Sequence, residues 1–101
     1  MEYKTRDIQD GREIAINGRM TFADHNAMRD IIATFEAAGL KKIVFDLSGV
    51  EFIDSAALGM LLLARETAIS RQAHVVLRGA RDQARRIMAV AKFDKLFTVE
   101  A

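Results

Sequence analysis

Residues 46–59 of this 101-residue chain read Asp46-Leu47-Ser48-Gly49-Val50-Glu51-Phe52-Ile53-Asp54-Ser55-Ala56-Ala57-Leu58-Gly59. They join an apolar strand to a helix that opens on Ala, Leu and Gly. The unpaired amides at the start of a helix attract an oxygen acceptor, so either Asp54 or Ser55 is expected to be the N-cap. Capping alone would account for this pair, and residues 48–51 are expected to form a turn.

The residues before this stretch predict a hairpin. Asp10-Gly11 is a turn signal, because glycine adopts a positive φ without steric cost. Ile14 and Ile16 alternate with other residues at the spacing of a half-buried strand, and Gly18 is expected to end that strand. Thr21-Phe22-Ala23-Asp24 then fits a capping box, with Asp24 as a competing cap.

A helix and a buried strand are expected next. One apolar face recurs at helical spacing and consists of Met28, Ile31, Ile32 and Phe35. Gly39 is placed where a left-handed C-terminal cap belongs. Ile43-Val44-Phe45 lacks alternation, which is typical of a strand that is covered on both faces or lies at the centre of a sheet.

The second half of the chain continues the alternation of helices and strands. A helix is predicted over Ser55–Ser70 and a short buried strand over His74–Arg78. A third helix starts near Arg81, and its apolar face is expected to contain Ala84, Ile87, Met88 and Ala91. Residues 96–99 are expected to form a terminal strand or a packed tail.

This order of elements predicts a single α/β domain over residues 1–101. Crossovers between strands favour parallel pairs, while the hairpin adds an antiparallel pair. We therefore expect a mixed sheet of four to five strands with helices packed against it.

The helix after Ser55 has more apolar surface than one core face requires. Leu58, Leu61, Leu62 and Ile69 fit one buried stripe, whereas Met60, Leu63 and Ala64 fall partly off it. Such a surface is either a second contact within the core or a patch for a partner, and periodicity leaves both open.

Composition excludes several functional classes. Fifteen Lys and Arg oppose fourteen Asp and Glu, for a net charge of +1, which argues against direct binding of nucleic acid. There is no cysteine and there are only two histidines, so neither a metal site nor a cofactor site is predicted. Ser55 has no Gly-x-Ser-x-Gly elbow around it, so the chain is not expected to be an enzyme.

Two further features bear on location and partners. The amino terminus lacks the apolar stretch of a signal peptide, and the longest strongly apolar run, Ala56 to Ala64, is too short to span a bilayer. No transmembrane segment and a cytoplasmic location are therefore expected. The cluster Arg78, Arg81, Arg85 and Arg86 could contact an acidic partner or a phosphate, although an exposed helix face with this spacing is more often simply solvated.

The stretch from Asp46 to Leu62 resembles the signature of the STAS domain family, the fold of bacterial anti-sigma factor antagonists. Residues 85–97 resemble the closing helix and tail of that family, so the similarity covers nearly the whole chain. The Asp-Ser pair with the upstream Asp-Leu-Ser is its most specific part.

The resemblance implies a switch rather than a catalyst. In antagonists of this kind, the serine matching Ser55 is phosphorylated by a partner anti-sigma factor that acts as a serine kinase. The unmodified protein binds that partner, the modified protein is released, and a serine phosphatase resets it. The residues implied in partner binding are Asp24, Asp54, Ser55, Ala56, Ala57, Gly59, Met60 and Leu63.

Two positions depart from the pattern of phosphorylated antagonists. Ala57 stands where most of them have Gly, and Ala56 where many have Ser or Thr. Some STAS domains are never phosphorylated and serve as interaction subunits of lipid transporters, sensory complexes or chemoreceptor-associated assemblies. In that alternative Ser55 would be only a helix cap, and the apolar surface of the helix would bind a fixed partner.

Overall fold

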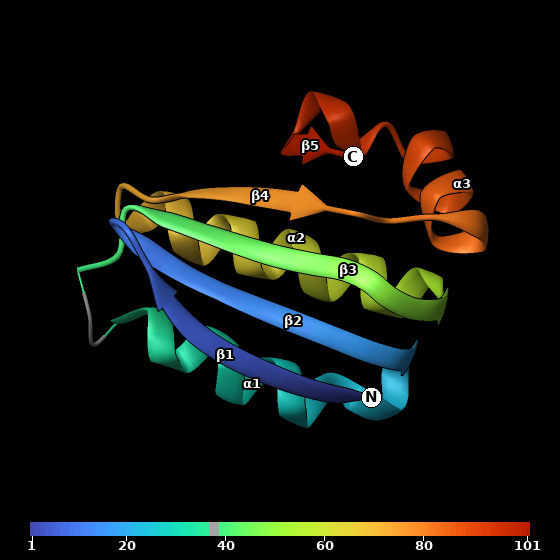
Figure 1. The fold of residues 1–101 in the computed structure, drawn as a ribbon, viewed down its shortest axis with the longest axis horizontal. Coiled ribbons are helices and arrows are strands. Elements are labelled where there is room, and N and C mark those ends of the chain that lie inside the picture. The colour runs from blue at the N-terminus through green and yellow to red at the C-terminus, as the bar shows by residue number, and fades with distance from the viewer. Residues whose placement is uncertain (37–38) are drawn as a thin grey trace.

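The computed structural model describes residues 1–36 and 39–101 and shows a five-stranded mixed sheet (Figure 1). The strands are β1 (Glu2–Ile8), β2 (Gly11–Met20), β3 (Lys42–Ile53), β4 (His74–Arg78) and β5 (Thr98–Glu100). Their order in the sheet follows their order in the chain. β1 and β2 are antiparallel, and the other neighbouring pairs are parallel. The predicted mixed sheet is thus confirmed, with residues 98–100 as its fifth strand.

Three helices complete the α/β domain. They are α1 (His25–Ala33), α2 (Ser55–Ser70) and α3 (Asp82–Val90), with short 3-10 turns η1 (Phe22–Asp24), η2 (Thr34–Glu36) and η3 (Phe93–Lys95). Figure 1 shows α1 and α2 alongside the sheet, and α3 beyond the end of β4. Among the described residues, no helix has both the length and the apolar character needed to cross a membrane.

The core lies between the sheet and the two helices α1 and α2. Ile14, Ile16 and Phe45 from the strands are fully buried there. The four residues predicted as one apolar helix face are buried as well: Met28, Ile31 and Ile32 belong to α1, whereas Phe35 lies just past its end, in η2. Burial of a face with helical spacing, rather than intrinsic helix propensity, is what stabilises a helix as short as α1.

The opposite face of the sheet is covered by a network of ion pairs. Val44 and Val76 are buried but lie outside the main core, and the strand register places Glu13 beside Val44. The Glu13 carboxylate accepts hydrogen bonds from Arg6, at 2.9 and 3.2 Å, and from Arg78, at 3.2 Å. Arg78 also pairs with Glu100 at 3.1 Å. Arg78 is therefore engaged within the domain.

The hairpin is confirmed, but with a different residue in the left-handed conformation. Asp10 has the positive φ of 62°, whereas Gly11 begins β2 in extended geometry. A side chain at Gly11 would collide with the backbone carbonyl of Lys42 in the neighbouring strand. Glycine is thus required at this position for the close approach of two strands.

Two predicted breaks in strands are wrong. Residues 48–51 belong to β3 rather than to a turn, and β2 continues past Gly18 to Met20. The pairing of β2 with β3 shifts register after Ala15 and again after Gly18. Such irregularities let a parallel pair continue past Gly18 and Gly49 instead of ending there.

Details of the helices also differ from expectation. In α2, Ile69 is exposed, whereas Ala64 is fully buried against the sheet side. In α3, Ala84 and Met88 are buried, but Ala91 lies past the end of the helix and is exposed. Gly39, predicted as a left-handed C-terminal cap, has the expected positive φ of 58°. Residues 37–38, which connect it to the preceding helix, lie outside the described residues.

Gly11→Ala is expected to destabilise the domain by about 1–3 kcal/mol, because the β2 and β3 backbones must separate to admit the methyl group. The matched control is Gly59→Ala in α2, where an added Cβ meets nothing within 4 Å. The control should stabilise the domain by about 0.5–1 kcal/mol, since alanine loses less backbone entropy in a helix. Urea unfolding measures both, and equal stabilities for the two variants would contradict the packing argument.

Candidate functional site

The start of α2 is organised around the carboxylate of Asp54. Its Oδ1 accepts a hydrogen bond from the Ala57 amide at 2.8 Å, and its Oδ2 accepts one from the Phe22 amide at 3.1 Å. The Asp54 amide itself donates to the Met20 carbonyl at 3.2 Å. Asp54, and not Ser55, is therefore the N-cap, and it ties α2 to the end of β2 and to η1.

Ser55 is the first residue of α2, and its side chain is exposed. Its hydroxyl has no hydrogen-bond partner among residues 1–36 and 39–101, because Asp54 already satisfies the helix amide that Ser55 could have capped. The Ser55 oxygen is therefore accessible from solvent.

Gln83 holds the backbone just before this pair. Its side-chain oxygen accepts a hydrogen bond from the Ile53 amide at 2.9 Å, and its nitrogen donates to the Ile53 carbonyl at 2.8 Å. This double contact brings α3 to the end of β3. Sequence analysis missed Gln83, and no local signal could have indicated it, because the two residues are 30 positions apart.

Asp24 lies at the same edge of the sheet as Asp54. Its carboxylate accepts hydrogen bonds from the Thr21 amide at 2.9 Å and from the amino group of Met1 at 2.9 Å. Thr21 and Phe22 are consecutive, so the two carboxylates bind adjacent amides of one turn. Desolvation alone would raise the pKa of Asp24, but the hydrogen bond from Thr21 and the Met1 ammonium outweigh it and lower that pKa.

An aromatic side chain that sequence analysis did not single out lies beside these carboxylates. Phe22 is 67% exposed, although its amide is bonded to Asp54. Its ring stacks on His25 with centroids 5.2 Å apart. Exposed aromatic residues held in one orientation are frequent anchors in protein interfaces, so Phe22 extends the candidate surface beyond α2.

The other residues predicted to bind a partner divide into exposed and buried ones. Ser55, Gly59 and Leu63 are exposed and follow one another at intervals of four, so they share one face of α2. Ala56 and Met60 flank that face and are partly buried. The side chain of Ala57 is fully buried, so it packs in the core and is not part of this surface.

No group of three or more His, Asp or Glu side chains that could hold a metal ion occurs in the part of the chain that the structure describes. This edge carries two carboxylates that accept backbone amides, the exposed Ser55 and the exposed residues Gly59 and Leu63 of α2.

The family model described as "Mlab, STAS domain" matches residues 5–99. The chain belongs to the STAS domain family. A STAS-domain containing protein of Pseudomonas aeruginosa is 36% identical over 94 residues, which cover 89% of this chain and 90% of that protein. This agrees with the resemblance seen in residues 46–62.

Solved STAS structures share the fold at low sequence identity. A putative anti-sigma factor antagonist from Thermotoga maritima has a TM-score of 0.86 at 16% identity, covering 98% of this STAS domain and 86% of that chain. The anti-sigma factor antagonist SpoIIAA of Bacillus, in its unphosphorylated form, has a TM-score of 0.76 at 14% identity, with 99% and 87% covered. A sulfate transporter family protein from Wolinella succinogenes has a TM-score of 0.74 at 19% identity, with 87% and 74% covered. The fold thus occurs in both antagonists and transporters.

Asp54→Ala is expected to reduce the free energy of unfolding by about 1–2 kcal/mol, because α2 loses its cap and the Phe22 amide loses its acceptor. Asp54→Asn should retain most of that stability, since an amide oxygen also caps a helix. Asp30→Ala on the exposed face of α1 is the control for loss of a carboxylate. Thermal unfolding distinguishes them, and equal losses for Asp54→Ala and Asp30→Ala would contradict the capping role.

Asp24 is expected to make stability depend on pH in acid. Because its pKa is lowered in the folded state, its contribution is complete above the ordinary Asp pKa of about 4 and is lost as the pH falls through the lower, folded value. The stability advantage of the native protein over Asp24→Asn should therefore shrink below about pH 4. Urea unfolding at stepwise lower pH measures this advantage, and a constant difference across that range would refute it.

Proposed function

We propose that this STAS domain is an anti-sigma factor antagonist that binds an anti-sigma factor kinase and is released when Ser55 is phosphorylated. The proposal depends on one observation about two adjacent residues. Asp54 caps α2, so the side chain of Ser55 is exposed and forms no hydrogen bond with the described residues. The similarity to solved antagonists supports it through the fold.

The phosphorylation step would take place on a backbone that is already held in place. The Ser55 oxygen forms a bond to the γ-phosphorus of ATP, the bond to the β-phosphate oxygen breaks, and the serine proton leaves to a base on the kinase. Contacts from Met20, Phe22 and Gln83 hold residues 53–54, so the acceptor needs little reorganisation to enter an active site. The STAS domain is then a substrate of the kinase and not a catalyst.

The added phosphate would change binding through charge. It adds roughly −1.5 to −2 charges at neutral pH, directly beside the Asp54 carboxylate and close to the turn that Asp24 caps. A partner packed on Gly59 and Leu63 would have to desolvate that charge. The domain itself should tolerate the phosphate, because the start of a helix favours an anion.

The reverse step would be hydrolysis of the phosphoserine by a serine phosphatase. Exposure of Ser55 makes the phosphorus accessible to a second enzyme. The same surface would thus serve in turn for partner binding, modification and reset.

A fixed interaction subunit is the second candidate function. The sulfate transporter family neighbour shows that the fold also occurs outside antagonists, and Ala56 and Ala57 replace residues typical of phosphorylated members. In this case the face of α2 with Gly59 and Leu63 would bind its partner regardless of ATP.

The test is incubation of the domain with an anti-sigma factor kinase from the same organism and ATP, followed by intact-mass measurement. We expect one phosphoryl group on the native protein and none on Ser55→Ala. Ser55→Asp should bind the kinase roughly 10- to 100-fold more weakly than the native protein. Ser70→Asp, at the exposed far end of the same helix, is the matched control and should bind normally.

Two results would reject the switch. One is unchanged affinity for Ser55→Asp, and the other is a stable complex that forms equally with and without ATP and yields no phosphoprotein. The second result would support the fixed interaction subunit instead.

A further inference from the structure

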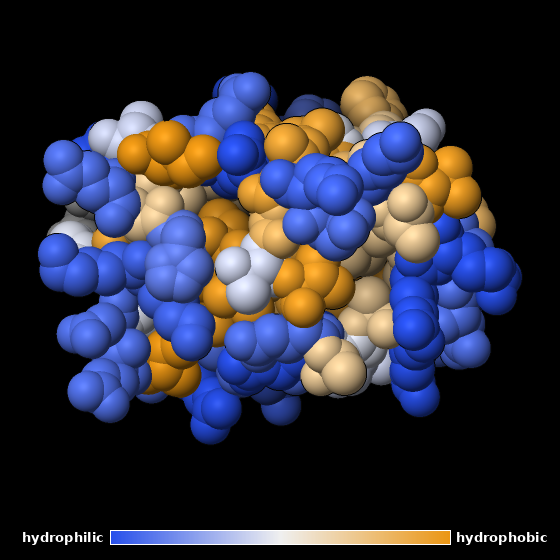
Figure 2. Space-filling view, turned by 90° about the horizontal axis from the view of Figure 1, so that it is seen from above, coloured by the Kyte–Doolittle hydropathy of each residue, from blue (hydrophilic) through white to orange (hydrophobic). Residues whose placement is uncertain are grey.

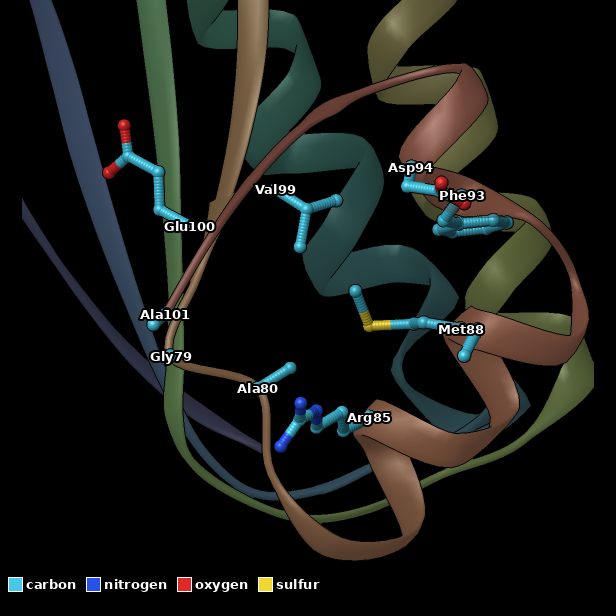
Figure 3. Close-up of a pocket in the computed structure, with 10 residues that line it drawn as sticks. Gly79, Ala80, Arg85, Met88, Phe93, Asp94, Val99, Glu100 and Ala101 are labelled. Carbon is cyan, nitrogen blue, oxygen red and sulfur yellow. The ribbon is translucent and has the colours of Figure 1, made fainter.

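A cavity of about 620 Å³ lies between α3, η3 and β5, away from the face of α2 that carries Ser55. Its apolar lining comes from Ala80, Met88, Ala89, Phe93 and Val99. Figure 3 shows Met88 and Val99 pointing into the space between the helix and the strand. The volume falls in the range of about 300–1,000 Å³ that is usual for small-molecule sites.

Arg85 faces this apolar space, and the described residues offer its guanidinium no ion-pair partner. Arg85 lines the cavity, and its side chain extends toward Ala80 in Figure 3. No ion pair to its guanidinium occurs among the described residues, in contrast to Arg78, which pairs with Glu13 and Glu100. Two carboxylate residues, Glu100 and Asp94, also line the cavity. The Glu100 carboxylate points toward the opposite face of the sheet, and Asp94 lies beside Phe93, on the far side of the cavity from the Arg85 guanidinium (Figure 3).

The C-terminal segment that lines the cavity carries more positive than negative charge. Residues 78–101 contain six Lys and Arg against three Asp and Glu, whereas residues 1–77 contain nine against eleven. Figure 2, the view from above, shows hydrophobic residues in the middle of this face with hydrophilic residues around them. An anion would therefore be favoured at this end of the molecule.

We propose that the cavity binds a small, freely diffusing amphipathic anion. Its apolar body would pack between Met88, Phe93 and Val99, and its single carboxylate or phosphate would pair with Arg85. The planar guanidinium can donate two parallel hydrogen bonds to such a group. An apolar wall with one charged anchor is the usual composition of sites for ligands of this kind.

Helix α3 connects the cavity to the candidate phosphorylation site. Met88 and Arg85 line the cavity from this helix, and Gln83, two residues before Arg85, binds the Ile53 backbone two residues before Ser55. A bound ligand that displaces α3 therefore alters the geometry at residues 53–55. The regulatory meaning of this coupling rests on the proposed function, whereas binding itself does not.

The test is an NMR titration of the full chain with octanoate as the probe, and with octanol as the uncharged counterpart. We expect saturable amide shifts at residues 79–80, 88–89 and 98–99, accompanied by shifts at residues 53–55. Arg85→Gln should weaken octanoate binding about tenfold through loss of the charge-assisted pair. Arg86→Gln, on the same helix but outside the cavity lining, is the matched control and should bind normally.

Two further variants separate the parts of the proposal. Ala89→Phe, which fills the cavity from an exposed helix position, should abolish the shifts. Gln83→Ala should keep octanoate binding at the cavity but remove the shifts at residues 53–55. Because neither readout uses a kinase, a failure of Ser55 phosphorylation would not affect them.

Several results would overturn the proposal. Equal binding of octanol, equal binding by Arg85→Gln, shifts confined to α2, or no saturable shift would each exclude an anion site in this cavity. Binding to phosphatidylglycerol vesicles without binding of octanoate would reject the freely diffusing ligand in favour of a lipid surface.

Discussion

The two hydrogen bonds accepted by the Asp54 carboxylate hold the functional edge of the domain together. One oxygen caps α2 through the Ala57 amide, and the other fixes the turn after β2 through the Phe22 amide. Without this carboxylate as acceptor, the helix start and the turn would each have an unpaired amide, which costs free energy. Because Asp54 meets both needs, the exposed Ser55 side chain is not required as the cap of α2.

This arrangement depends on the parallel pairing of β2 with β3. Parallel strands end at the same edge of a sheet, so Met20 and Ile53, which are far apart in the chain, become neighbours in register. The turn that follows β2 and the helix that follows β3 therefore start side by side. α3 reaches the same edge through Gln83, so three elements hold residues 53–54 in place.

Local patterns predicted most elements, and they failed where distant pairing overrides them. Ser55–Ser70 was predicted with the correct ends because a cap and a long apolar segment coincide there. Residues 48–51 carry a turn-like Ser-Gly, yet pairing with residues 17–18 across the parallel ladder keeps them extended. Likewise Ile69 is exposed and Ala64 buried, since the part of α2 that faces the sheet depends on the crossing of helix and sheet.

The sequence by itself determined the α/β order of elements, the STAS family and the Asp54-Ser55 pair, because these depend on periodicity and on residues adjacent in the chain. Only the tertiary structure decided which member of the pair caps the helix, since it shows the Ala57 amide bonded to the Asp54 carboxylate, whose second oxygen is held by the Phe22 amide 32 residues away. It also decided that Arg78 is neutralised by Glu13 and Glu100, while Arg85 is left facing a cavity. The sequence alone does not show which arginine of this cluster is paired within the domain. That depends on position, because Arg78 lies on β4 and Arg85 on α3.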